Sequence, residues 1–184
     1  MTPTILFYIF ISILIVSFII DQGLDTLNAK HYNDTIPEVL NDIYDTEEYQ
    51  KSQDYKKTNY RFSLITASFS IVTTLAFFFL DGFAIIDGIA RDFSKNEIII
   101  TLLFFGIIML GSDIITTPFS YYQTFVIEEK FGFNKTTKKL FIIDKIKGWL
   151  MSIVLGGVIL ALLTWFYQTT ENMFWLYAWA LIAG

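Results

Sequence analysis

Few side chains in this sequence combine reactive chemistry with a position at which it could be used. Glu128 and Glu129 are adjacent carboxylates in a polar and aromatic segment between two apolar runs, and a carboxylate can act as a general base or a metal ligand. Asp113 lies inside an apolar run, where an acid is costly in lipid and should face protein or water. His31 is the single histidine and cysteine is absent, so this chain alone cannot complete a zinc site of several His or Cys ligands.

The composition places these residues in a membrane protein. Of the 184 residues, 54% are hydrophobic and 18% are aromatic. Only 17% are charged, whereas about a quarter are charged in an average soluble domain. The formal net charge of −5 gives no basis for nucleic-acid binding. The absence of cysteine excludes disulfides within the chain.

Four apolar runs meet or approach the length that crosses a bilayer core, which is about 20 residues of helix. They occupy residues 4–20, 62–80, 98–117 and 148–167, and Asp113 is the only charged residue among them. A fifth run, residues 173–184, is too short to span as it stands. The sequence therefore predicts an all-α, polytopic membrane domain over the whole chain, with four full transmembrane helices and the start of a fifth.

The first apolar run resembles a signal peptide only in its position. No Lys or Arg precedes it, and no small-residue cleavage site follows Ile20. We therefore interpret residues 4–20 as an uncleaved first transmembrane helix.

Basic residues are unevenly divided between the predicted loops. Eleven of the thirteen Lys and Arg residues lie in loops 21–61 and 118–147, which share one side of the membrane if the spans alternate. The other two, Arg91 and Lys95, lie between the second and third runs. An excess of Lys and Arg marks the cytoplasmic side. We therefore expect an outside N-terminus and two cytoplasmic loops, in a bacterial inner membrane or in the endoplasmic reticulum.

Two sets of polar residues within the apolar runs have alternative interpretations. Asp113 either lines a cavity that faces substrate or is an interfacial acid bonded to a neighbouring helix. Thr66, Ser70 and Thr74 recur every four residues, which places them on one side of a helix. Small hydroxyl residues of this kind favour close packing between helices, and cavity lining is the alternative.

The long segments outside the runs carry their own local signals. We expect Asp45 to cap a helix that continues through Tyr60 into the second run. We expect Pro118 to end the third helix, and the β-branched residues from Thr124 to Ile127 to run extended.

A turn and a helix start are predicted further along the same segment. Gly132, between Phe131 and Phe133, allows a tight turn. Asn134 or Thr137 could then cap the helix that leads into the fourth run.

Two stretches of the sequence carry a family resemblance. The first, Glu47 to Tyr55, is followed by Arg61-Phe62; the second runs from Pro118 to Thr137 and is followed by Phe141. Both are similar to segments of the type I CAAX prenyl endopeptidases, which are integral-membrane zinc metalloproteases, and the resemblance covers residues 40–184. The family-motif residues of the second stretch, to which we assign a structural or domain-docking role, are Pro118, Phe119, Tyr122, Thr124, Phe125, Glu128, Glu129, Gly132, Asn134, Thr137, Asp144 and Lys147.

The resemblance implies a function for a longer protein. The family binds zinc through a His-Glu-x-x-His motif, which is absent here, so the resemblance implies no catalytic, metal-binding or cofactor-binding residue in this chain. Residues 1–184 would be the N-terminal membrane domain, and zinc would belong to the parent protein. The implied partners are the lipid bilayer, the parent's own C-terminal catalytic domain, and a peptide or lipidated-protein substrate, with no nucleic acid.

The family's fold is a ring of membrane helices around a water-filled chamber. The resemblance therefore implies that these helices form part of the chamber wall and that loop 118–147 lies near the active site. Glu128 and Glu129 would brace this loop against the catalytic domain.

The residues alone leave two other functions open. One is a catalytically empty membrane scaffold or adaptor, and the other is a small transporter or channel with Asp113 in its path. The run at 173–184 argues against both, because a partial helix leaves unpaired backbone groups in lipid.

Overall fold

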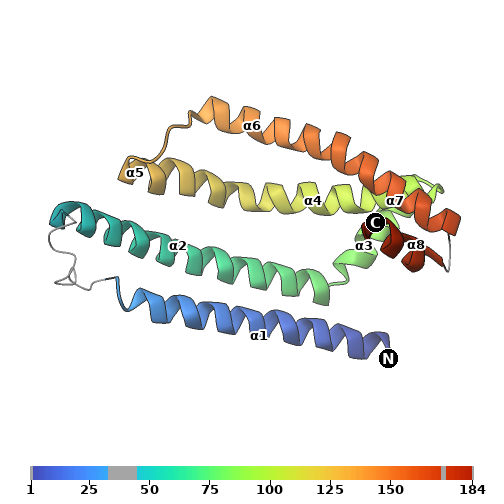
Figure 1. Cartoon of the computed structure of the whole chain (residues 1–184), viewed down its shortest axis with the longest axis horizontal. Coiled ribbons are helices and arrows are strands. Elements are labelled where there is room, and N and C mark those ends of the chain that lie inside the picture. Colours follow the sequence, from blue (N-terminus) through green and yellow to red (C-terminus); the bar gives the residue numbers. More distant parts are fainter. Residues whose placement is uncertain (1, 33–44, 171–172, 184) are drawn as a thin grey trace. The chain divides into compact units, whose positions relative to one another are not determined.

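The computed structural model describes residues 2–32, 45–170 and 173–183, and every regular element in these ranges is helical (Figure 1). Four helical stretches are long and apolar enough to cross a membrane: Pro3–Ala29, Thr46–Phe79, Glu97–Phe131 and Lys138–Thr170. The predicted fold class, an all-α polytopic membrane domain, is confirmed. The elements are α1 (Pro3–Ala29), α2 (Thr46–Phe79), α3 (Gly82–Phe93), α4 (Glu97–Tyr122), the π-helix η2 (Gln123–Glu128), α5 (Glu129–Phe131), α6 (Lys138–Met151), the π-helix η3 (Ser152–Gly156), α7 (Gly157–Thr170) and α8 (Phe174–Ala183).

The chain forms two compact units. The first consists of Met1–Leu80 and Phe119–Asn134, and the second of Asp81–Pro118 and Lys135–Gly184. The loop predicted at 21–61 includes residues 33–44, which lie outside the described residues, as does Gly184 at the end of the fifth run.

In the first unit, α1 and α2 pack side by side along their length (Figure 1). Near the start of α1, the ring of Phe7 lies 5.5 Å from that of Phe79 at the end of α2. Towards the other end, the hydroxyl groups of Thr26 and Tyr60 are 3.0 Å apart. The two helices are therefore antiparallel and remain in contact over most of their length.

Helix α2 begins where the sequence predicts. The side chain of Asp45 accepts a hydrogen bond from the backbone N–H of Glu47 at 3.0 Å, which satisfies one of the free donors of the first turn. The helix then continues through Tyr60 to Phe79 without a break. The prediction that this helix runs into the second apolar run is confirmed.

Two local predictions for the second family-like stretch, residues 118–137, are wrong. Pro118 lies inside α4 rather than ending it, and residues 124–127 belong to the π-helix η2 rather than to an extended stretch. Proline is tolerated in membrane helices because local adjustments satisfy the backbone groups that it frees. Strand propensity is a weak preference that side-chain packing overrides, and here the segment packs against α2.

The turn and the cap predicted beyond this segment are confirmed. Gly132 has φ +81°, the left-handed conformation that glycine adopts without strain. The hydroxyl of Thr137 accepts a hydrogen bond from the N–H of Leu140 at 3.2 Å and caps α6.

In the second unit, α6, η3 and α7 form one continuous helical stretch. Helix α8 follows, and the ring of Phe174 lies 5.6 Å from the ring of Phe166 on α7.

Candidate functional site: the anchored motif segment

In the first unit, the two stretches that carry the family resemblance are in direct contact. The hydroxyl of Tyr55, on α2, donates a hydrogen bond to Oε1 of Glu128, on η2, at 2.6 Å. The Tyr55 ring also lies edge-on to the rings of Phe131 and Phe133, with centroids 5.2 and 4.9 Å away. One tyrosine therefore contacts both the charged and the aromatic part of the second stretch.

A second hydrogen-bond path joins the same two helices. The amide nitrogen of Gln123 donates to Glu128 Oε1 at 2.9 Å and to Asn59 Oδ1 at 2.8 Å. The amide nitrogen of Asn59 in turn donates to the backbone carbonyl of Tyr55 at 3.0 Å. The four side chains thus form a continuous network, which we call the Tyr55–Glu128 network. Partly buried networks of this kind rigidify a structure when their members are satisfied.

Aromatic contacts continue the same interface along α2. The Phe62 ring is stacked 5.2 Å from Tyr122, and the Phe69 ring lies 4.8 Å from Phe119. With Tyr55 and Asn59, these two phenylalanines recur at the spacing that puts residues on one face of a helix. One face of α2 therefore holds the motif segment from Phe119 to Phe133.

The motif segment is a well-packed part of the chain. Ile127 and Phe131 are only 3% and 6% exposed, whereas most apolar side chains of the spans are open to their surroundings. The backbone carbonyl of Glu128 accepts from the N–H groups of Phe133 and Asn134 at 2.9 and 3.2 Å, which closes the turn at Gly132. The segment is therefore an ordered structure and not a flexible tether.

Glu128 and Glu129 both use their carboxylates within this segment. Glu128 accepts from Tyr55 and Gln123, and Glu129 accepts from the amide nitrogen of Asn134 at 2.6 Å. Two other motif residues complete the local packing: Phe125 lies 4.7 Å from the Tyr121 ring, and Thr124 is half-buried. The carboxylates thus stabilise the segment, and their bracing of a catalytic domain stays a proposal.

The second unit holds a separate carboxylate site at Asp113. Its Oδ1 accepts from Lys145 Nζ at 2.7 Å, and its Oδ2 accepts from the indole nitrogen of Trp149 at 2.8 Å. Both donors lie on α6, so this acid on α4 is bonded to a neighbouring helix, as one of the two interpretations of the sequence expects. The hydroxyl of Thr117 donates to the Asp113 backbone carbonyl at 2.6 Å. Asp144 and Lys147, also on α6, are exposed.

The role of Thr66, Ser70 and Thr74 on α2, either helix packing or cavity lining, stays a prediction. Thr66 donates its hydroxyl hydrogen to the carbonyl of Ser63 at 3.1 Å, within its own helix. Thr66 and Thr74 are half-buried and Ser70 is exposed. These contacts fit a packing role but assign no ligand.

A metal site does not fit the part of the chain that the structure describes. Among those residues, no three His, Cys, Asp or Glu side chains gather closely enough to hold a metal ion. We therefore assign no step of metal chemistry to residues of this chain.

Sequence reasoning singled out Glu128 but missed three of its network partners. Tyr55 was only part of a similar stretch, and Asn59 and Gln123 were not singled out. The usable signal was the helical recurrence of 55, 59, 62 and 69, which places polar and aromatic residues on one face of α2. That recurrence is hard to see because Lys56, Lys57 and Arg61 lie among its first positions.

The helices and the anchored segment define a polytopic membrane domain, and comparison with known proteins identifies its family. A family model described as the N-terminal part of CAAX prenyl proteases, with five membrane helices, matches residues 25–184. The chain belongs to this family. The resemblance stated from the two sequence stretches is thereby confirmed.

Individual relatives agree with the family model. A CAAX prenyl protease 1 homolog of Dictyostelium discoideum is 34% identical over 154 residues, covering 81% of this chain and 36% of the relative. A homolog of Arabidopsis thaliana is 32% identical over 182 residues, covering 94% of this chain and 42% of the relative.

A solved structure shows the same fold. The crystal structure of S. mikatae Ste24p matches 96% of this chain, with a TM-score of 0.86 and 31% sequence identity, over 42% of its own length. The chain therefore spans about two fifths of that protein and similar fractions of the curated relatives.

Proposed function

We propose that this chain is the membrane-embedded N-terminal domain of a zinc metalloendopeptidase that cleaves prenylated or membrane-associated proteins. The family match supports the peptidase class, because the relatives are named CAAX prenyl proteases. The single observation that carries the proposal is the Tyr55–Glu128 network, in which the two family-like stretches meet. A contact between two such stretches is expected if both serve one site.

The helices would form part of the wall of a chamber, and loop 118–147 would lie near the active site. The anchoring of residues 119–134 on α2 supports this role, because sites held on rigid elements keep their geometry more precisely than free loops. A chamber in the membrane would let an extended peptide reach the catalytic groups while an apolar tail stays in lipid.

The zinc ligands would be supplied by a part of the parent protein outside residues 1–184. Bound zinc lowers the pKa of its water and so provides a nucleophile for peptide hydrolysis. The residues of this chain would line the chamber and help to orient the substrate in it. We also propose that the active site faces the cytoplasm, together with loops 21–61 and 118–147, because these loops hold eleven of the thirteen basic residues.

A transporter or channel function is not favoured. Asp113, the acid that would lie in its path, is already paired with Lys145 and bonded to Trp149. A carboxylate engaged in this way joins α4 to α6 and has a structural role without any solute.

Cleavage of a peptide in sealed vesicles tests both the activity and its side. The natural gene product would be expressed in membrane vesicles whose cytoplasmic face is outward, and a farnesylated peptide with a CAAX terminus would be added outside. We expect cleavage without detergent. It should be abolished by the chelator 1,10-phenanthroline but not by its non-chelating 1,7-isomer, and the same peptide without the lipid serves as the substrate control.

Two results would count against the proposal. Absence of cleavage even after detergent opens the vesicles would remove the peptidase function. Cleavage that appears only after detergent is added would keep the activity but reverse the proposed orientation.

A further inference from the structure

Helix α3 is too short to cross a membrane. Its 12 residues, Gly82–Phe93, give a length of about 18 Å at about 1.5 Å per residue, whereas the bilayer core is about 30 Å thick. At its two ends α3 is joined to helices that are long enough to span, α2 ending at Phe79 and α4 beginning at Glu97. This connectivity keeps α3 at one surface of the bilayer.

One side of α3 is packed within the second unit. Ala90 is fully buried at 0% exposure, and the ring of Phe83 is stacked 6.3 Å from Phe104 on α4. This packed side sets how the helix is rotated about its own axis.

A second side of α3 is apolar and open. Ile85, Ile89 and Phe93 follow one another at intervals of four residues and are 57%, 53% and 79% exposed. Because residues four apart lie on one face of a helix, they form a continuous stripe, which we call the α3 stripe. Phe93 is among the most exposed large apolar side chains in the part of the chain that the structure describes.

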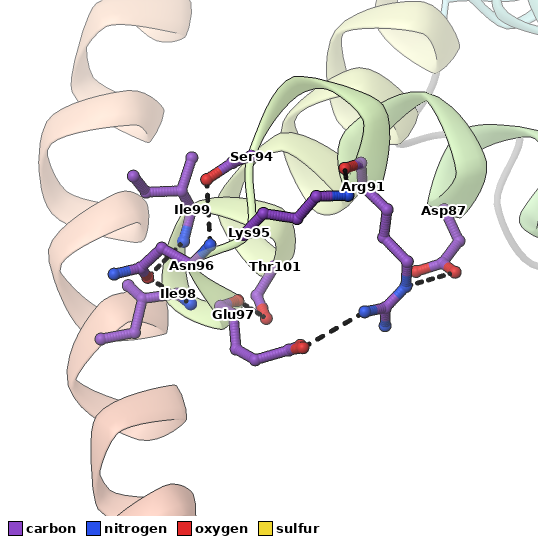
Figure 2. A network of polar contacts seen from close by, with 9 residues as sticks. All are labelled: Asp87, Arg91, Ser94, Lys95, Asn96, Glu97, Ile98, Ile99 and Thr101. Carbon is purple, nitrogen blue, oxygen red and sulfur yellow. Dashed lines mark hydrogen bonds and ion pairs between the residues drawn. The ribbon is translucent and has the colours of Figure 1, made fainter.

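A third side carries Asp87 and Arg91, which Figure 2 shows in one network with Glu97 at the start of α4. Arg91 donates through Nε to Asp87 at 2.8 Å and through Nη1 to Glu97 at 3.2 Å. The hydrogen bonds that Arg91 donates to Asp87, and then to Glu97, raise the pKa of its guanidinium above the ordinary value. Arg91 is therefore paired with two carboxylates, and it stays protonated at physiological pH.

The corner between α3 and α4 is fixed by further hydrogen bonds in the same view (Figure 2). Asn96 caps α4, since its side-chain oxygen accepts from the N–H groups of Ile98 and Ile99 at 2.9 and 3.3 Å. The N–H of Asn96 donates to the Ser94 hydroxyl at 3.1 Å, and Lys95 Nζ donates to the Arg91 carbonyl at 3.4 Å. The direction of α3 relative to α4 is thereby set.

We propose that α3 is an interfacial helix and that the α3 stripe docks on the lipid bilayer. Helices with one apolar face and one charged face lie in the plane of the membrane interface, with the apolar face among the acyl chains. The network of Asp87, Arg91 and Glu97 would then lie at the headgroup level. Lipid is the favoured occupant because the flanking spans hold α3 at the membrane surface, where acyl chains are within reach of the stripe.

Spin labelling measures this directly. Residues 1–184 contain no cysteine, so a nitroxide can be placed by Ile85→Cys, Ile89→Cys or Phe93→Cys in the full gene product, with any cysteine elsewhere replaced by serine. Ala84→Cys and Gly88→Cys are matched controls, because both positions are exposed but lie off the stripe. The labelled proteins would be reconstituted in phosphatidylcholine vesicles and checked for folding by size exclusion.

The readout is the ratio of collision rates with oxygen, which partitions into lipid, and with a water-soluble nickel chelate. We expect a high oxygen-to-nickel ratio at each stripe position that yields a folded protein and a low ratio at the two controls. High nickel accessibility at the stripe would show that it faces water and would overturn the proposal. Low accessibility to both reagents would show that another protein segment or a second copy covers the stripe, which would also overturn it.

Discussion

At the scale of single residues, a tyrosine hydroxyl and a carboxylate join the two family-like stretches. Tyr55 and Glu128 are separated by most of the second and third spans in sequence, yet their side chains are 2.6 Å apart. Hydrogen bonds between helices of membrane proteins contribute about 0.6 kcal/mol on average, with larger values for some pairs. A bond to a charged acceptor belongs at the stronger end of this range.

Tyr55→Phe should therefore destabilise the protein by about 1 kcal/mol, because the ring contacts remain while the donor to Glu128 is lost. The measurement is the midpoint of denaturation in detergent micelles. Tyr8→Phe is the control, since Tyr8 is exposed and, among the described residues, its ring contacts Phe7 while its hydroxyl has no hydrogen bond. Equal midpoints for the two variants would show that the Tyr55–Glu128 bond contributes nothing.

At the scale of elements, the turn at the end of α5 depends on a left-handed backbone conformation, which glycine adopts most easily. Gly132 ends α5 with a positive φ and lets Phe131 and Phe133 both reach the Tyr55 ring. No heavy atom outside its own neighbourhood lies within 4 Å of the position that a Cβ would occupy. Substitution there would strain the backbone without creating a clash.

Gly132→Ala should lower the free energy of unfolding by about 1 kcal/mol, which is the cost of the left-handed conformation for a residue with a Cβ. Gly148→Ala is the matched control, because Gly148 lies in α6 and a Cβ there would likewise meet no heavy atom of the described residues within 4 Å beyond its chain neighbours and its own helix backbone. Alanine in a helix should instead stabilise by about 0.5–1 kcal/mol. Denaturation midpoints that shift in the same direction for both variants would contradict this assignment.

The elements also show where sequence reasoning succeeds and where it fails. Apolar run length predicts the spans because lipid imposes both helix formation and a minimum length. Caps at Asp45 and Thr137 were predictable because they depend on a few neighbouring residues. The continuation of α4 through Pro118 and the π-helix after it were not, because they arise with packing against α2, which is distant in sequence.

At the scale of the whole molecule, the family and the membrane fold could be predicted from the sequence, whereas the contacts within the site could not. The second motif stretch was specific enough to indicate the family, which the family model confirms. The Tyr55–Glu128 network was hidden because its members come from two stretches that fold together only in three dimensions. The division of the chain into two units likewise has no marker in composition.

The central claim is that these helices belong to a longer peptidase whose catalytic residues lie elsewhere. The most direct test is the intact mass of the protein purified from its native membrane, with sequencing of its C-terminal peptides. We predict a mass well above the 21.3 kDa of this chain and peptides that carry a His-Glu-x-x-His sequence. A mature product of 21.3 kDa that ends at Gly184 would contradict the claim and would leave a membrane scaffold that shares the fold of a peptidase domain.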